Sequence, residues 1–193
     1  MSRADSGTDG RGAFDSADLH AIVIETKRLV LRQLELGDAG FILELLNEDA
    51  FVRYIGDKGV RSLSDAREYI DKGPIDSYER YGFGLYAACL RDGTPVGICG
   101  LVKRDGLADV DVGFAFLSRH CSKGYAVESA SAVLAHARRE LRLQRVVAIT
   151  SHDNSGSIAV LEKIGLKFER MIRLTEQGPE LKLFGPAQAE HRP

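Results

Sequence analysis

A short basic turn near the middle of the chain, R-H-C-S-K-G-Y-A-V-E-S over residues 119–129, has the residue types that bind phosphate. It opens a segment with helical periodicity, and the N–H groups exposed at the start of a helix stabilise an anion. Gly124 has no side chain and Ala126 has a small one, so a phosphate can approach the backbone closely. Lys123 and Arg119 add positive charge. Phosphate binding is therefore the first chemistry that the residues indicate.

A purely structural turn is the competing interpretation, because short glycine motifs are common between strands and helices. The segment matches neither the P-loop pattern G-x-x-x-x-G-K-S/T nor the dinucleotide pattern G-x-G-x-x-G. The turn by itself leaves both interpretations open, and the surrounding elements have to decide between them.

The segments on either side of the turn have the periodicities of strands and helices. Alternating or continuous apolar runs predict seven strands: a first one made of two strand-like pieces, and six more. These segments are residues 22–33, 82–90, 95–103, 109–117, 145–150, 166–174 and 180–184.

Helices are predicted between these strands. Asp38 can cap the first helix, and Ser62 with Asp65 can cap the second, which Gly73-Pro74 is predicted to end. The third begins at the basic turn, and the fourth is stopped by Gly165, where a left-handed residue is needed. This order predicts a mixed α/β fold of seven strands, in which an antiparallel meander leads into a β-α-β unit and helices cover both faces.

Length and composition are those of one domain with a full core: 193 residues, of which 44% are hydrophobic. We expect tails at residues 1–21 and 186–193 around a domain of residues 22–185. A net charge of −2 argues against a broad nucleic-acid surface. No apolar run reaches the ~18 residues of a membrane span, and the N-terminus lacks an apolar signal core, so the expected location is the cytoplasm.

Metal and disulfide chemistry are not indicated. The three cysteines are scattered, which suits a reducing compartment, and Cys89 and Cys99 fit buried strand positions. The five histidines form no H-E-x-x-H pattern, so we expect no catalytic metal.

The element order and the K-G-Y-A turn together resemble the GNAT superfamily of N-acetyltransferases, and within it the RimJ/RimL-like branch of ribosomal-protein N-acetyltransferases. The resemblance covers about residues 22–184 and depends on the order and spacing of five pieces. These are E-T-K-R-L-V-L-R-Q-L (25–34), V-G-I-C-G-L (96–101), D-V-G-F (111–114), K-G-Y-A-V-E-S (123–129) and N-S-G-S-I-A-V-L-E-K-I-G-L (154–166).

The resemblance implies acetyl-CoA as the acetyl donor, in a cleft where two parallel strands splay apart. The family's pyrophosphate motif, Q/R-x-x-G-x-G/A, falls on Cys121, Ser122, Lys123, Gly124, Tyr125 and Ala126. Cys121 departs from the usual Gln or Arg, and Arg119 is a hypothetical substitute. A covalent acyl-cysteine at Cys121 is the less favoured alternative, because the family transfers the acetyl group directly.

Three further positions are implied as cofactor contacts. Backbone groups at Phe116 and Leu117 match those that grip pantetheine in the family, and Asn154 matches an Asn that contacts the cofactor there. An Asn at that position is also explained as an ordinary helix N-cap.

The resemblance suggests Asp111 as a general base acting through water, just before Gly113, a residue that would allow a β-bulge. The alternative is that Asp111 and Asp109 lie on a solvated strand face. The tyrosine that is the usual acid of the family is replaced by Leu161, so the candidate acid is Ser157, whose alternative role is capping. If neither acts, positioning of the reactive thioester can carry the rate.

The predicted function is transfer of acetyl from acetyl-CoA to a primary amine by direct attack in a ternary complex. The acceptor is either a protein N-terminal amine, with a ribosomal protein as one possibility, or a small-molecule amine. The alternative is a weakly catalytic acyl-CoA-binding sensor or interaction module, and a nucleotide-binding α/β protein is a third interpretation. Homodimers are common in the family.

Overall fold

The computed structural model describes residues 22–187, so the predicted N-terminal tail lies outside the described residues, as do residues 188–193 of the predicted C-terminal tail. Pro186, expected in that tail, belongs to the last strand. The strands are β1 (Ile22–Glu25), β2 (Leu29–Gln33), β3 (Leu85–Leu90), β4 (Pro95–Val102), β5 (Val110–Phe116), β6 (Val146–Ser151), β7 (Leu166–Ile172) and β8 (Leu181–Pro186). The helices are η2 (Leu36–Asp38), α1 (Ala39–Leu46), α2 (Asp49–Tyr54), α3 (Leu63–Ile70), η3 (Asp71–Ile75), α4 (Asp76–Tyr81), η4 (Ser118–His120), α5 (Tyr125–Arg139) and α6 (Ser155–Lys163).

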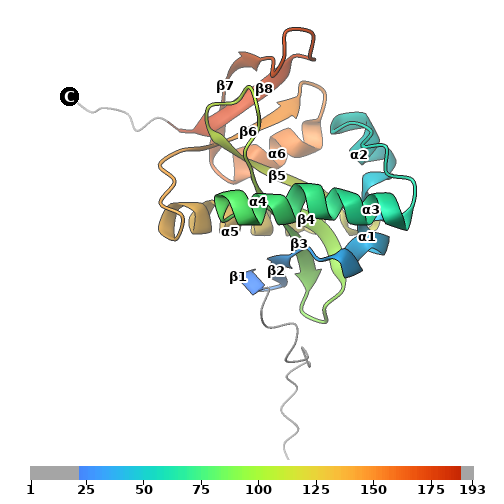
Figure 1. The fold of residues 1–193 in the computed structure, drawn as a ribbon. Helices are drawn as coiled ribbons and strands as arrows, with labels where there is room; N and C mark the ends of the chain where they lie inside the picture. The colour runs from blue at the N-terminus through green and yellow to red at the C-terminus, as the bar shows by residue number, and fades with distance from the viewer. Residues whose placement is uncertain (1–21, 188–193) are drawn as a thin grey trace, which may run out of the picture.

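The strands form one mixed sheet in the order β1-β2-β3-β4-β5-β6-β8-β7 (Figure 1). Only β5 and β6 pair in parallel, and all other neighbours are antiparallel. The predicted mixed α/β fold is confirmed, but residues 22–187 contain eight strands rather than seven. The two strand-like pieces at the start are separate strands, because the chain turns at Thr26 and β1 folds back on β2.

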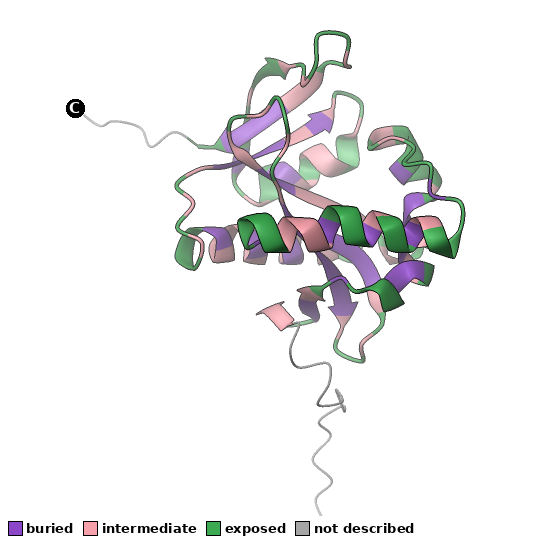
Figure 2. Cartoon of the chain, viewed as in Figure 1, coloured by how far each residue is buried: buried purple, intermediate pink, exposed green. Residues whose placement is uncertain are grey.

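Helices cover both faces of the sheet, with α3 and α4 on one side and α5 on the other (Figure 1). One buried cluster joins α1 and α3 to the sheet through Ile42, Ile70 and Ile98. The other joins α5 and α6 through Val133 and Leu161. The strands between them are largely buried, as Figure 2 shows, so the central strands are held rigidly from both sides.

The predicted end of the second helix at Gly73-Pro74 is wrong. The Ser62–Asp65 capping box begins α3 as expected, but the chain continues through a π-helical turn into α4. There the N–H of Asp76 donates to the carbonyl of Asp71, five residues earlier. The wider turn accommodates the missing N–H and the ring of Pro74, and Pro74 is buried, so packing favours continuing the helix.

A buried ion pair joins β2 to the start of α1. Both guanidinium ends of Arg32 donate to the Asp38 carboxylate, at 2.7 and 2.8 Å, and Asp38 also accepts from the N–H of Glu35 at 3.0 Å. The Asp38 side chain is 7% exposed. Asp38 does precede α1, but its carboxylate binds Arg32 and Glu35 instead of capping that helix.

We expect Arg32→Ala to lower the free energy of unfolding by about 3 kcal/mol, because it leaves the buried Asp38 carboxylate without its cation. Urea denaturation measures this. The matched control is Arg91→Ala, which breaks the exposed pair with Glu25 and should cost less than about 1 kcal/mol. Equal costs for the two variants would contradict the role of burial.

Among residues 22–187, no helix is long and apolar enough to cross a membrane. The same residues contain no cluster of three or more His, Cys, Asp or Glu side chains that could hold a metal ion.

Candidate active site

The parallel strands β5 and β6 separate soon after they meet. Their pairing is limited to two positions at the start of each strand, Val110 with Val146 and Asp111 with Val147. Both strands then continue for four to five residues without pairing to each other. The facing backbone edges are thus free to bond a ligand that enters between them. The expected splayed pair is confirmed.

The basic turn lies between the end of β5 and the start of α5. Gly124 is the N-cap of α5 with φ +82°, and Ser122 has φ +60°. The N–H groups of Ser122, Lys123 and Gly124 make no hydrogen bond within residues 22–187. The amides of the first turn of α5, starting with Tyr125 and Ala126, likewise have no intrahelical partner. Several unpaired donors therefore gather where an anion would bind.

An interaction that the local sequence did not reveal supports this turn from behind. Arg28, in the β1–β2 loop, donates from Nη1 to the carbonyl of Lys123 at 2.9 Å and from Nε to Glu128 at 2.6 Å. Thr26 Oγ1 and the N–H of Arg28 also donate to Glu128, at 2.7 and 2.8 Å. The guanidinium lies 4.8 Å from the centre of the Tyr125 ring. Since about 100 residues separate the partners, no short motif could indicate the contact.

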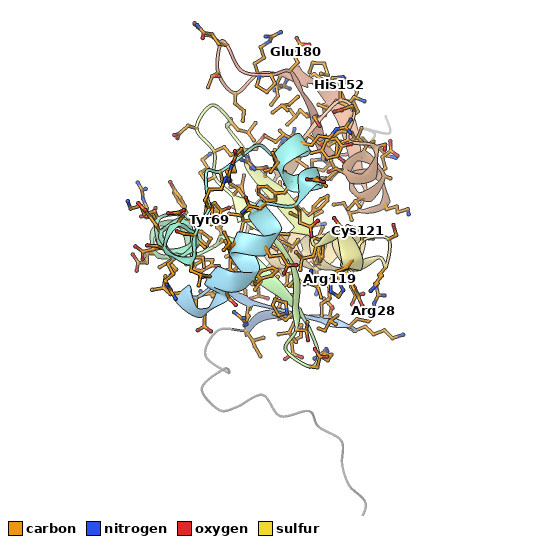
Figure 3. The ribbon with its side chains drawn as sticks, turned by 90° about the vertical axis from the view of Figure 1, so that its right-hand side faces the viewer. Arg28, Tyr69, Arg119, Cys121, His152 and Glu180 are labelled. Atoms are coloured by element: carbon orange, nitrogen blue, oxygen red, sulfur yellow. The ribbon has the colours of Figure 1, made fainter. Side chains whose placement is uncertain are left out.

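The proposed substitute cation, Arg119, already has a partner. Its guanidinium donates to both carboxylate oxygens of Glu44 on α1, one at 3.1 Å. Figure 3 shows Arg28, Arg119 and Cys121 on the same side of the molecule. A phosphate contact by Arg119 would require it to leave Glu44 or to serve both anions.

Cys121 is exposed, and its Sγ makes only long contacts of 3.7 and 3.8 Å with the carbonyls of Leu117 and Phe116. Partial burial raises the pKa of the Cys121 thiol, and the nearby Glu48 carboxylate raises it further. The thiol is therefore kept in its poorly nucleophilic protonated form. This disfavours a covalent acyl-cysteine.

The two backbone positions proposed for pantetheine differ. Leu117 donates its N–H to the carbonyl of Val96 at 3.0 Å, so that amide is already used. Successive amides of a strand point to opposite edges, so the Phe116 amide points toward the gap between β5 and β6. Gly113 causes no bulge, because the β4–β5 register is continuous along β5.

Two polar contacts tie the α1–α2 region to both splayed strands. Glu48 accepts from the N–H and the hydroxyl of Ser118, just after β5. Arg53 on α2 pairs at 3.3 Å with Asp153, just after β6. The segment therefore bridges the ends of the strands between which the ligand would enter.

Asn154 caps α6: its Oδ1 accepts from the N–H of Ser157 at 3.0 Å. The capping interpretation is thus correct, while the amide Nδ2 has no partner within the described residues and is available to a ligand. The Ser157 hydroxyl also makes no hydrogen bond within residues 22–187. Leu161 is 1% exposed in the core, so no donor replaces the family's usual tyrosine at that position.

Asp111 lies on β5 at the point where β5 and β6 part. It is 1% exposed, and its Oδ1 accepts from Arg104 Nε at 2.9 Å. Burial raises the pKa of Asp111, while the Arg104 charge and hydrogen bond oppose this rise. A buried carboxylate with a raised pKa lowers the free energy of unfolding at neutral pH. Such costly groups are concentrated at functional sites, so Asp111 is a candidate site residue. The solvated-face interpretation is therefore wrong for Asp111.

Asp109 has a different environment. Its carboxylate accepts from Arg145 Nε at 2.9 Å, and Arg145 also pairs with Glu169. Asp109 therefore belongs to a surface ion-pair network and not to the buried group around Asp111.

Lys58 and Tyr69 stand close enough to Arg104 to respond to its charge, and sequence reasoning missed both. Partial burial lowers the pKa of Lys58, and the Arg104 charge lowers it further. Burial raises the pKa of the Tyr69 hydroxyl, which Arg104 partly offsets. Lys58 in the α2–α3 loop and Tyr69 on α3 therefore lie within range of the charge of Arg104, which pairs with Asp111 on β5.

Comparison with known proteins agrees with this geometry. Residues 28–167 match the acetyltransferase (GNAT) domain family. The uncharacterized N-acetyltransferase YnaD of Bacillus subtilis (strain 168) is 31% identical over 147 residues, covering 76% of this chain and 83% of the relative.

Solved structures share the fold. A GNAT-family acetyltransferase from Bacillus anthracis superposes with a TM-score of 0.70 at 26% identity, covering 84% of this chain and 96% of that one. RimL, an alpha-N-protein acetyltransferase of ribosomal L7/L12 solved with coenzyme A, superposes with a TM-score of 0.72 at 17% identity, covering 86% and 96%. The chain belongs to the GNAT acetyltransferase family and is an enzyme of that family.

Proposed function

We propose that the protein transfers an acetyl group from acetyl-CoA to a primary amine by direct attack in a ternary complex. The observation that carries the proposal is the joint placement of two features at the same strand. Unpaired amides follow the end of β5 at Gly124, and the buried Asp111 carboxylate lies near its start, beside the opening between β5 and β6.

The binding of acetyl-CoA is assigned to the turn and the β5 edge. The pyrophosphate would accept hydrogen bonds from the amides of residues 122–126. Because these amides have no partners within the described residues, no hydrogen bond of the protein has to break when the pyrophosphate binds. Pantetheine would bond to the Phe116 amide in the gap between β5 and β6. Asn154, which follows β6, would contact acetyl-CoA through its Nδ2 from the β6 side of the gap. The thioester would then lie in the gap, along β5 toward Asp111.

Asp111 is assigned as the general base. An alkyl amine with a pKa of about 10.4 is almost entirely protonated at neutral pH and must lose a proton before it attacks. Asp111 would accept that proton through water, and its raised pKa makes it a stronger base than an exposed Asp. The nearby positive charges of Arg104 and Lys58 also favour the neutral amine.

The bond changes are those of acyl transfer. The amine nitrogen forms a bond to the acetyl carbonyl carbon and loses a second proton to solvent, and the carbon–sulfur bond then breaks, releasing the thiolate of CoA. Ser157 is assigned as the donor of a proton to that thiolate, after which its hydroxyl recovers a proton from solvent. The family's tyrosine is replaced by Leu161, which is buried and has no proton to donate. Of the candidate acids predicted from the sequence, Ser157 is the one that this helix supplies.

The acceptor is proposed to be either a protein N-terminal amine or a small-molecule amine. RimL, by its description, acts on the N-terminus of a ribosomal protein, and it shares the fold at 17% identity. We therefore propose peptides with ribosomal-protein N-termini as the first acceptors to try.

Turnover tests the proposal. We expect release of free CoA thiol when the protein, acetyl-CoA and a suitable amine are combined, with acetylated amine formed in equal amount by mass spectrometry. The acceptor set should pair peptides with free N-termini against the same peptides with blocked N-termini, and should include polyamines and amino sugars. CoA binding without turnover of any amine would instead support the sensor or interaction module.

A further inference from the structure

We propose that Arg28 is a second cationic arm of the cofactor site: it reaches the basic turn from the β1–β2 loop and donates to a phosphate of CoA. This inference rests on the proposed binding of acetyl-CoA. It adds a contact from outside the phosphate motif, from a part of the chain about 95 residues earlier.

The guanidinium of Arg28 is held in place by three interactions. Nε pairs with Glu128 at 2.6 Å, Nη1 donates to the carbonyl of Lys123 at 2.9 Å, and the planar group lies over the Tyr125 ring at 4.8 Å. Such a group is preorganised, so little side-chain entropy remains to be lost when it binds an anion.

One end of the guanidinium is left free. Nη2 makes no hydrogen bond within residues 22–187, and it lies 3.3 Å from the position that a Cβ on Gly124 would occupy. The free N–H groups of Nη2 therefore adjoin the unpaired amides of the turn. The Arg28 side chain is 44% exposed, so a ligand can reach it.

The charged side chains around the turn also support a phosphate contact by Arg28. Arg119 is paired with Glu44, which leaves Lys123 as the motif's own unpaired cation among the described residues. Glu128, on the first turn of α5, places a carboxylate close to where the phosphate would bind. Burial alone would raise the pKa of Glu128, but the hydrogen bonds from Thr26 and Arg28 outweigh it and lower that pKa, so the carboxylate is charged. Arg28 therefore has to offset Glu128 as well as bind the ligand.

The test compares three ligands by calorimetry: CoA, 3′-dephospho-CoA and pantetheine, which has no phosphate. We expect Arg28→Ala to weaken CoA binding by about 10- to 100-fold, the loss typical of a hydrogen bond to a charged group, and to leave pantetheine affinity unchanged. Arg28→Lys should lose less CoA affinity than Arg28→Ala, because lysine retains the positive charge. A full loss with 3′-dephospho-CoA would assign the contact to the pyrophosphate, and a reduced loss would assign it to the 3′-phosphate.

Arg173→Ala is the matched control. Arg173 is an arginine of similar exposure, 51%, that also binds one carboxylate, Glu180, and one backbone carbonyl, that of Gly178. It lies between β7 and β8, and its loss should not change CoA binding. Thermal unfolding confirms that both variants are folded.

The double variant Arg28→Ala/Glu128→Gln separates contact from charge compensation. If Arg28 binds phosphate, the double variant stays weaker than wild type for CoA. Recovery of wild-type affinity would show that Arg28 only offsets Glu128, and it would overturn the proposal. An effect of Arg28→Ala below about twofold on CoA, or an equal loss for pantetheine, would also overturn it. Failure of wild type itself to bind CoA would refute the proposed cofactor instead, so the two failures are distinguishable.

Discussion

Gly124→Glu is expected to abolish CoA binding, by at least about 100-fold relative to a wild-type affinity in the micromolar range typical of enzyme substrates. The new carboxylate would lie among the unpaired amides of the turn and would repel the pyrophosphate. A Cβ there would also lie 3.3 Å from Arg28 Nη2, and the glutamate would compete for that guanidinium. Calorimetry of CoA binding to both proteins measures the effect.

The control has to reproduce the backbone strain, because Gly124 has φ +82° and L residues are disfavoured there. Gly93→Glu supplies this: Gly93 has φ +87° in the β3–β4 turn, and a Cβ added to it would meet no atom within 4 Å beyond its chain neighbours. We expect similar losses of stability, about 1 kcal/mol each, but CoA binding lost in Gly124→Glu alone. Unchanged CoA binding by a folded Gly124→Glu variant would remove the turn from the cofactor site.

Asp111→Asn is expected to lower kcat by about 10²- to 10⁴-fold, the usual contribution of a general base, while CoA affinity stays near wild type. The amide has a similar shape but cannot accept the proton of the amine. Steady-state kinetics with the best acceptor found, together with CoA calorimetry, checks this result.

Asp109→Asn is the matched control: Asp109 lies two residues earlier, and its carboxylate pairs with Arg145. It should leave kcat within about twofold of wild type, as for an ordinary surface charge. Ser157→Ala, measured beside them, should reduce kcat by a smaller factor than Asp111→Asn if it assists only the departing thiolate. Full activity of Asp111→Asn would mean that positioning of the thioester carries the rate.

The pH dependence follows from the direction of the Asp111 shift. Burial raises its pKa, so activity should fall on the acid side at a higher pH than for an exposed aspartate. Arg104→Ala removes the opposing cation and should move this acid limb to still higher pH. A group whose pKa is raised by folding stabilises the fold below its unfolded pKa, and this contribution is lost as pH rises through the folded pKa. Asp111→Asn should therefore lack that part of the pH dependence of unfolding.

Local signals in the sequence were reliable where neighbouring residues decide the structure. The Ser62–Asp65 capping box begins α3, and Gly165, at φ +89°, ends α6. The turn at Gly124 has the left-handed backbone that its glycine indicates. At Gly73-Pro74 the local signal failed, because burial of Pro74 against the core outweighed the tendency of these residues to end a helix.

The sequence by itself determined the fold class, the place of the basic turn at the start of α5 and the candidate site residues, because caps, turns and periodicity depend on residues a few positions apart. Only the tertiary structure decided which charges meet. It pairs Arg28 with Glu128, Arg119 with Glu44 and Arg104 with Asp111. Two of these contacts join residues 75 or more positions apart, and the third depends on burial of Asp111 beneath neighbouring elements. Charge partners and burial are set by packing of the whole sheet, so no local pattern could specify them.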